Sequence, residues 1–224
     1  MTQAKTRLTF EEYAKLDAED WVRLGLPEGR CEYVENGELN ELPSESEPND
    51  FLARYLLFLL ASSGTVPLRL IAIHTCEIAV MGKPKTRFPD LVILKEEHLR
   101  LMQKRLYISL TMPLPRLVAE VVSPGDDNEK RDYEAKREQY RVRGVPEYWL
   151  INPKEQTIQI LKLEAGQYVE VGTFQGDDRL DSPTFPTLNL TAHQVLTAGE
   201  GETYKTNVLP TFPDITSSGT VEEI

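Results

Sequence analysis

The stretch Arg87-Phe88-Pro89-Asp90-Leu91-Val92-Ile93-Leu94 is a mostly apolar run that carries one carboxylate near its middle. The stretch Leu117-Val118-Ala119-Glu120-Val121-Val122 has the same character. Both runs have the length and composition of strands buried in a sheet. A carboxylate in such a strand costs several kcal/mol unless a cation or a hydrogen-bond donor meets it. Asp90 and Glu120 therefore predict a charged site within the core, and two carboxylates there favour a metal ion.

The segment after the second run is expected to supply a cation. A helix is predicted over 128–143, closed by Gly144, which suits a helix end. At about 100° per residue, Asp132, Lys136 and Tyr140 share one arc of this helix. Because an aromatic arc indicates the packed face, the Lys136 ammonium is expected to point toward the sheet. The structural alternative is a lysine whose stem packs while its head reaches water.

Two strand carboxylates and an inward lysine are a minimal set for hydrolysing a phosphodiester. Asp90 and Glu120 would hold Mg²⁺ or Mn²⁺, since hard divalent cations prefer oxygen ligands. The ion would polarise the phosphate and help to generate hydroxide. Lys136 would orient the attacking water or neutralise developing negative charge.

The remaining pattern predicts an α/β fold, with a central mixed sheet flanked by helices and a C-terminal β extension. We expect a helical lead-in over 1–30, one domain over 31–197, and a loose or partner-docked tail over 198–224. Helices are expected over Leu8–Asp20, from Asn49 or Asp50 to Ser62, over Lys95–Gln103 and over Thr191–Leu196. Further strands are expected over Cys31–Val34, Glu38–Leu42, Val66–His74, Glu77–Val80, Arg105–Thr111, Glu147–Asn152, Thr157–Leu163 and Tyr168–Phe174.

Bulk composition narrows the class of protein. With 224 residues, 40% of them hydrophobic, the chain can bury one good core. No apolar run approaches the roughly 20 residues needed to cross a bilayer. Two cysteines, Cys31 and Cys76, and no secretory leader favour a soluble cytoplasmic protein. The net charge of −11 argues against a surface coated for nucleic acid, although 128–144 is slightly basic.

The arrangement of these motifs resembles that of known nucleases. Pro89-Asp90 followed by Glu120 is similar to the Pro-Asp…(Asp/Glu)-x-Lys signature of the restriction-endonuclease-like superfamily, with Val122 standing where that signature has lysine. The run from Glu120 to Pro124, the spaced helix residues and Gly144-Val145-Pro146-Glu147-Tyr148-Trp149 resemble the Uma2 family of endonucleases more closely. This resemblance covers roughly residues 30–197.

The resemblance implies a metal-dependent nuclease acting on DNA, with the lysine moved from the strand to the helix at Lys136. Family members also carry an acid in an N-terminal hairpin. Here either Glu32 or Glu35 stands near the Asn36-Gly37 turn, and Glu32 is preferred because a strand carries it. Many members have a histidine where this chain has Asn49. Homodimerisation is plausible, since cutting both DNA strands commonly uses two sites.

Other readings compete with a nuclease. The histidines His74, His98 and His193 lack ligand spacing, so ordinary structural roles are expected for them. The acidic net charge favours a non-catalytic binding or regulatory module that keeps the fold. In a third reading Lys136 serves only to neutralise the buried acids.

Overall fold

A mixed six-stranded sheet forms the centre of the computed structural model, which describes residues 8–125 and 130–198. In spatial order its strands are β11 (Gln167–Gln175), β10 (Thr157–Glu164), β9 (Glu147–Asn152), β8 (Leu117–Val121), β6 (Leu91–Ile93) and β3 (Ile71–Ile73). β8 and β9 run parallel, and the other neighbours pair antiparallel. All five residues of β8 are buried, as expected for a strand covered on both faces.

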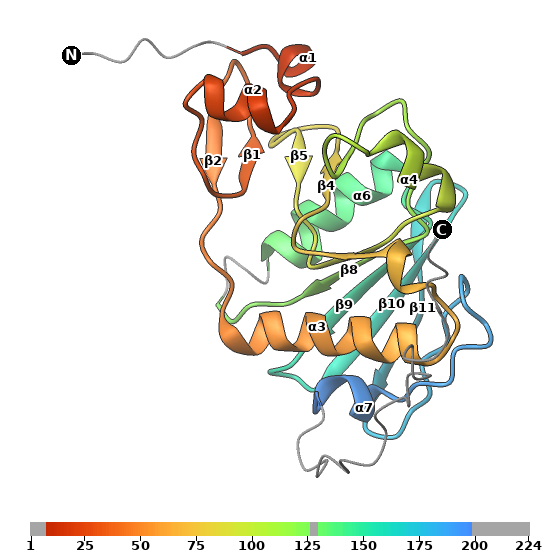
Figure 1. The fold of residues 1–224 in the computed structure, drawn as a ribbon. Helices are drawn as coiled ribbons and strands as arrows, with labels where there is room; N and C mark the ends of the chain where they lie inside the picture. The colour runs from red at the N-terminus through yellow and green to blue at the C-terminus, as the bar shows by residue number, and fades with distance from the viewer. Residues whose placement is uncertain (1–7, 126–129, 199–224) are drawn as a thin grey trace, which may run out of the picture.

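Helices cover both faces of this sheet (Figure 1). Helix α3 (Glu47–Ser62) packs against α7 (Ala192–Leu196) on one side, where α7 also contacts β10 and β11. The other side is covered by a continuous helical segment, π-helical in η2 (Arg131–Lys136) and α-helical in α6 (Arg137–Arg143). The predicted α/β class with a mixed sheet and flanking helices is confirmed, and the C-terminal hairpin β10–β11 extends the same sheet.

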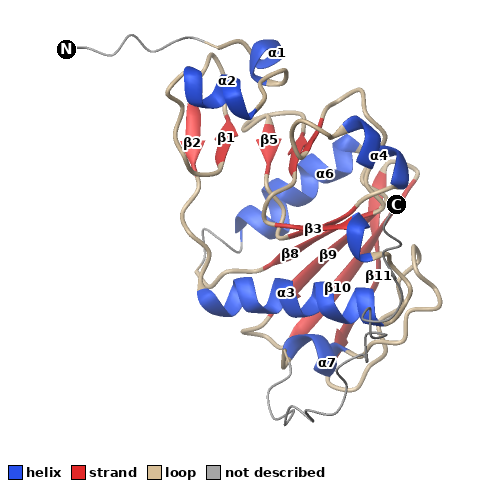
Figure 2. Ribbon diagram, in the orientation of Figure 1, coloured by secondary structure: helices blue, strands red, loops and turns tan. Residues whose placement is uncertain are grey.

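Two smaller sheets and the remaining helices complete the fold (Figure 2). These elements are α1 (Phe10–Tyr13), α2 (Ala18–Arg23), β1 (Cys31–Tyr33), β2 (Leu39–Glu41), η1 (Leu68–Leu70), β4 (Glu77–Ala79), β5 (Thr86–Arg87), α4 (Glu96–Leu101) and β7 (Tyr107–Ile108). Strand β4 lies between β5 and β7. A small second core joins Tyr33 of the β1–β2 hairpin to the lead-in residues Leu8, Tyr13 and Leu16.

The N-terminal helix differs from its prediction. One helix was expected over Leu8–Asp20, but α1 ends at Tyr13 and α2 begins at Ala18. Thr9 caps α1 as predicted. The break follows from Asp17, whose side chain accepts from the N–H of Asp20 and so starts a new helix.

Helix α3 also begins earlier than expected. It starts at Glu47, with Ser46 at the N-cap position and Pro48 in the first turn. Proline is tolerated there because the first N–H groups of a helix have no intrahelical partner. Asn49 and Asp50 therefore lie inside the helix and are free to serve other contacts.

Three predicted strands are shorter in the structure by four residues or more. The strand expected over Val66–His74 is reduced to β3, because Pro67 leads into the 3₁₀ turn η1. The strand expected over Arg105–Thr111 is reduced to β7. β6 begins at Leu91, so Asp90 lies one residue before the strand, and Pro89 cannot donate to a sheet ladder there.

Within its described residues, the helix expected over 128–143 is π-helical over Arg131–Lys136, whereas a regular α-helix was expected. Gly144 ends the helix in a left-handed conformation, as predicted. Residues 128 and 129 and the tail after Ala198 lie outside the described residues. None of the helices within residues 8–125 and 130–198 combines the length and apolar character that spanning a bilayer requires.

Candidate functional site

Asp90 is fixed beside β8 by the backbone. Its Oδ2 accepts a hydrogen bond of 2.7 Å from the N–H of Val121, and the side chain is buried. In the antiparallel pairing of β6 with β8, Leu91 lies opposite Ala119. Extended by one residue, this register sets Asp90 opposite Glu120. The Asp90 charge also acts to raise the pKa of Glu120, so the two carboxylates lie near each other.

Glu120 is fully buried, and each of its two carboxylate oxygens has a donor from the covering helix. The Lys136 Nζ donates to Oε2 at 2.7 Å, and the Tyr140 hydroxyl donates to Oε1 at 2.8 Å. The expectation that the Lys136 ammonium points toward the sheet is therefore confirmed. The alternative of a head group reaching water is wrong, since only 9% of this side chain is exposed.

A third acid completes the cluster. Oδ1 of Asp132 lies 3.0 Å from Nζ of Lys136, four positions later, and Asp132 is fully buried. Nε of Arg131 also lies 3.1 Å from the same Oδ1. Asp132 shares the predicted arc with Lys136, and that shared arc was the sequence signal for this contact. The ammonium of Lys136 is thus held between two carboxylates.

The electrostatics of the cluster follow from burial opposed by charge. Burial raises the pKa of the Glu120 carboxyl to about 8, although the Lys136 charge opposes the rise. Burial acts to lower the pKa of Lys136, but the charges of Glu120 and Asp132 outweigh it and raise that pKa. Burial likewise acts to raise the pKa of Asp90, but His74 and the Lys136 charge outweigh it and lower that pKa. Lys136 is therefore firmly cationic.

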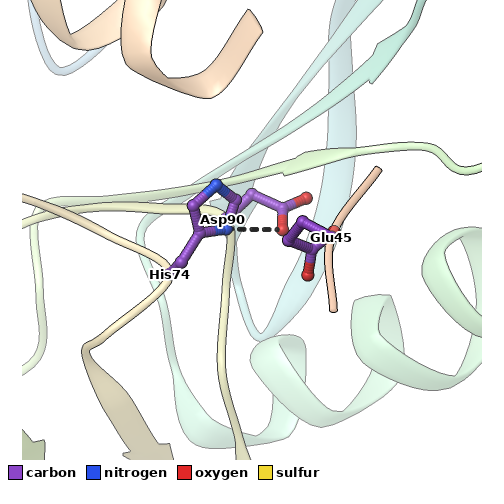
Figure 3. A group of neighbouring side chains, drawn as sticks. All are labelled: Glu45, His74 and Asp90. Atoms are coloured by element: carbon purple, nitrogen blue, oxygen red, sulfur yellow. Dashed lines mark ion pairs between the residues drawn. The ribbon is translucent and has the colours of Figure 1, made fainter. Parts of the chain in front are cut away.

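A second group of side chains adjoins Asp90 on the side away from Val121. His74, which follows β3, places its Nδ1 3.4 Å from Oδ1 of Asp90, and its Nε2 lies 3.5 Å from Oδ1 of Asp50 in α3. Glu45, in the loop before α3, approaches the same point (Figure 3). Glu45, His74 and Asp90 each contribute one possible ligand atom, and these three atoms lie within 4.8 Å of one another. A metal ion can bridge this spacing.

Sequence reasoning missed the place of His74. Its sequence separation from other residues that can bind a metal does not match any regular ligand spacing. The pairing of Ile73 with Leu91 between β3 and β6 brings His74 beside Asp90. His98 fills the structural role expected of it, since its Nδ1 accepts from the Lys95 N–H at 2.9 Å.

The predicted auxiliary acid Glu32 has a different set of partners. It is buried on β1, and its carboxylate accepts from Nη1 of Arg87 at 3.1 and 3.2 Å. Arg87 Nε donates to Gln139 at 2.7 Å, one residue before Tyr140. Within the described residues the structure thus links Glu32 to the helix through Arg87 and records no direct contact with Asp90, Glu120 or Lys136. Glu35 pairs instead with Lys83 near the surface.

Two further polar groups stabilise the surroundings. Glu77, on β4, is buried and bound by Arg105 and by the Tyr13 hydroxyl, so it has a structural role. Asn49 donates from Nδ2 to Ser123 Oγ at 2.8 Å, which ties the start of α3 to the segment after β8. The Asn49 contact lies next to β8, which carries Glu120, whereas the Glu77 contacts tie the lead-in helix α1 to the β5–β4–β7 sheet.

Comparison with known proteins agrees with this architecture. The family model described as "Uma2: Putative restriction endonuclease" matches residues 10–193. The chain belongs to the Uma2 family. Among solved structures, this Uma2 chain is similar to the crystal structure of a "putative nuclease belonging to DUF820" from Anabaena variabilis ATCC 29413. The TM-score is 0.55 at 16% identity, covering 82% of this chain and 98% of that one, which is a likeness of fold. No curated protein matches the chain.

Proposed function

We propose that this Uma2 chain is an endonuclease that hydrolyses DNA phosphodiester bonds with the help of a divalent metal ion, Mg²⁺ or Mn²⁺. The observation that carries the proposal is the Lys136 ammonium, 2.7 Å from Glu120, with Asp90 one residue before the adjacent strand β6. The family description of a restriction endonuclease and the fold likeness to a nuclease support it.

Asp90 and Glu120 are the proposed ligands. Their carboxylate oxygens suit a hard divalent cation, and Oδ2 of Asp90 is already oriented by the Val121 N–H. The fit is supported by the neighbouring His74 beside Asp90, because its two buried ring nitrogens have no hydrogen-bond partner among residues 8–125 and 130–198. When bound, the ion would polarise the scissile phosphate and lower the pKa of a bound water.

Lys136 is the proposed catalytic cation. Its raised pKa keeps the ammonium charged at neutral pH, and Asp132 anchors it at 3.0 Å. From this position the ammonium neutralises charge that develops on a phosphate oxygen or orients the attacking water. Tyr140 holds the second oxygen of Glu120, so the carboxylate keeps its direction when the ammonium turns to a substrate.

Glu32 is proposed as an auxiliary acid that acts at a distance. Its buried ion pair with Arg87 places the guanidinium against Gln139, in the same helix as Tyr140 and Lys136. Glu32 would therefore position the helix that carries the cation rather than contact the phosphate.

We further propose that the protein is cytoplasmic and acts as a homodimer. The cysteines Cys31 and Cys76 are both free and buried, which fits a reducing compartment. Two copies would supply the two sites needed to cut both strands of a duplex. Light scattering of the purified protein, alone and with duplex DNA, measures the proposed stoichiometry.

Incubation with supercoiled plasmid tests the nuclease proposal. Cleavage is expected with Mg²⁺ or Mn²⁺ and should stop when EDTA is added. Asp90→Asn is expected to abolish cleavage, and Asp177→Asn, at an exposed turn after β11, is expected to leave it intact. Absence of cleavage by the folded wild-type protein with either ion would contradict the proposal for this substrate.

A second candidate is a non-catalytic binding or regulatory module. It is favoured by the complete burial of Glu120, whose oxygens are both engaged by Lys136 and Tyr140, and by the net charge of −11. This candidate predicts metal binding without plasmid cleavage, so the same incubation separates the two functions.

A further inference from the structure

His74 is held in an unusual backbone conformation. Its φ of +53° lies in the left-handed region, which residues other than glycine seldom adopt. The surrounding backbone and side chains fix it there: the His74 N–H donates to the Asp90 carbonyl at 3.1 Å, and its own carbonyl accepts from Arg30 Nη1 at 3.3 Å. Conformations of this kind persist where the surroundings enforce them, often at binding sites.

The imidazole lacks the hydrogen bonds that a buried ring normally has. Both ring nitrogens are shielded from solvent and have no hydrogen-bond partner in the described part of the chain. Their distances of 3.4 Å to Asp90 and 3.5 Å to Asp50 are ion-pair separations. Because buried polar atoms are nearly always satisfied, this arrangement suits a ligand bound between the ring and its acids.

Glu45 supplies a third ligand atom from an independent segment. It comes from the loop before α3, and Figure 3 shows its carboxylate beside Asp90 and His74. Nη2 of Arg30 lies 2.8 Å from Oε1 of Glu45 and so holds the side chain in place. Two acids and an imidazole converging on one point are a donor set for a metal ion.

We propose that Glu45, His74 and Asp90 form a site for a first-row transition-metal ion, such as Co²⁺, in preference to Mg²⁺. Nδ1 of His74 is the nitrogen ligand, because it is the nitrogen that faces Asp90. Asp50, near Nε2, orients the ring in the way that carboxylates commonly support metal-bound histidines. Imidazole selects transition metals, whereas a site of oxygens alone suits Mg²⁺. This site shares Asp90 with the Asp90–Glu120 site of the proposed nuclease, and its role rests on that proposed function.

Calorimetric titration of the full chain, free of any histidine tag, tests this site with Co²⁺, Mn²⁺ and Mg²⁺ in turn. His74→Asn is the appropriate variant because asparagine tolerates the left-handed conformation. It is expected to weaken Co²⁺ binding by at least about tenfold while changing Mg²⁺ binding much less. His193→Asn, on the exposed side of α7, is the matched control and should leave Co²⁺ binding unchanged.

Further variants and spectra separate loss of the site from loss of the fold. Circular dichroism establishes that His74→Asn is folded, and Glu45→Gln, away from the strained backbone, should likewise weaken Co²⁺ binding. Asp50→Asn should weaken it by about 10- to 100-fold, as loss of supporting carboxylates commonly does. The Co²⁺ absorption spectrum should also change in His74→Asn, because a nitrogen ligand is lost.

Equal Co²⁺ affinity in folded wild-type, His74→Asn and Glu45→Gln proteins would overturn the proposed site. Tight, His74-dependent binding in a protein that cuts no plasmid would uphold the site and reject the nuclease. Metal-dependent cleavage by a protein whose Co²⁺ affinity does not depend on His74 would reject the proposed site and support the proposed nuclease function.

Discussion

Tyr140 binds the second oxygen of Glu120, one helical turn beyond Lys136, with its hydroxyl 2.8 Å from Oε1. The carboxylate is therefore held by one charged and one neutral donor from the same helix. Since Glu120 has no exposed surface, these donors replace the water that a carboxylate would otherwise bind. The helix and strand β8 are consequently coupled through this one side chain.

Tyr140→Phe is expected to destabilise the protein by about 1–3 kcal/mol, because a buried acceptor loses a donor. Tyr168→Phe is the matched control: this buried hydroxyl donates to the neutral carbonyl of Val145 at 2.9 Å. Bonds to charged groups contribute more than bonds to neutral ones. Urea unfolding should therefore show the larger loss for Tyr140→Phe, and equal losses would contradict the described role.

Lys136→Met is expected to lower the free energy of unfolding by about 3–5 kcal/mol, because Glu120 and Asp132 are left as buried acids without their cation. Adding Glu120→Gln should recover part of the loss. Lys162→Met, on the exposed part of β10, should change stability by no more than about 0.5 kcal/mol. Stability of Lys136→Met at or above wild type would contradict the role of this lysine as the cation that neutralises the buried acids.

The raised pKa of Glu120 predicts a pH dependence in metal-free protein. Its folded-state pKa of about 8 lies above the unfolded value of about 4.3, so the folded protein binds the extra proton. The stability that Glu120 contributes is therefore complete below about pH 4.3 and is lost as the pH rises to about 8. Asp90, whose pKa is lowered, acts in the opposite sense at acid pH.

Urea unfolding of wild type and Glu120→Gln in EDTA, from pH 5 to pH 9, measures this dependence. The wild-type free energy of unfolding minus that of the variant should decline with pH and level off near pH 8. A difference that stays constant across the range would show that Glu120 is ionised throughout.

Arg87→Met is expected to destabilise the protein by about 3–5 kcal/mol, since Glu32 would remain buried without its partner. The double variant with Glu32→Gln should regain much of that loss. If Glu32 positions the helix, Glu32→Gln should also slow plasmid cleavage at temperatures where it is fully folded, and Glu32→Asp should partly restore the rate. Full activity in folded Glu32→Gln would remove the auxiliary role.

Sequence periodicity predicted those parts of the fold that depend on local pattern. Strand β9 has the predicted bounds, Glu147–Asn152, because turn residues flank its apolar run on both sides and so define both ends of the strand. The inward direction of Lys136 followed from its arc with Tyr140. The π-helical turns before Arg137 could not be predicted, because they depend on hydrogen bonds between backbone groups that the side-chain pattern does not specify.

Contacts that depend on long-range pairing were beyond sequence reasoning. His74 meets Asp90 because β3 pairs with β6, and Glu45 joins them from a loop with no ligand spacing. In the sequence Arg87 stands at the start of an apolar run, with nothing to indicate its partner. In the structure it neutralises Glu32, which belongs to a different sheet. These partners emerge only after the strands are placed.

The most direct test of the central claim is the initial rate of plasmid cleavage in Mn²⁺ by Lys136→Met, compared with wild type and Lys162→Met at equal folded concentration. If the buried ammonium between Glu120 and Asp132 serves phosphodiester hydrolysis, wild type and Lys162→Met cut alike and Lys136→Met does not cut. Cleavage by Lys136→Met at the wild-type rate would contradict the claim.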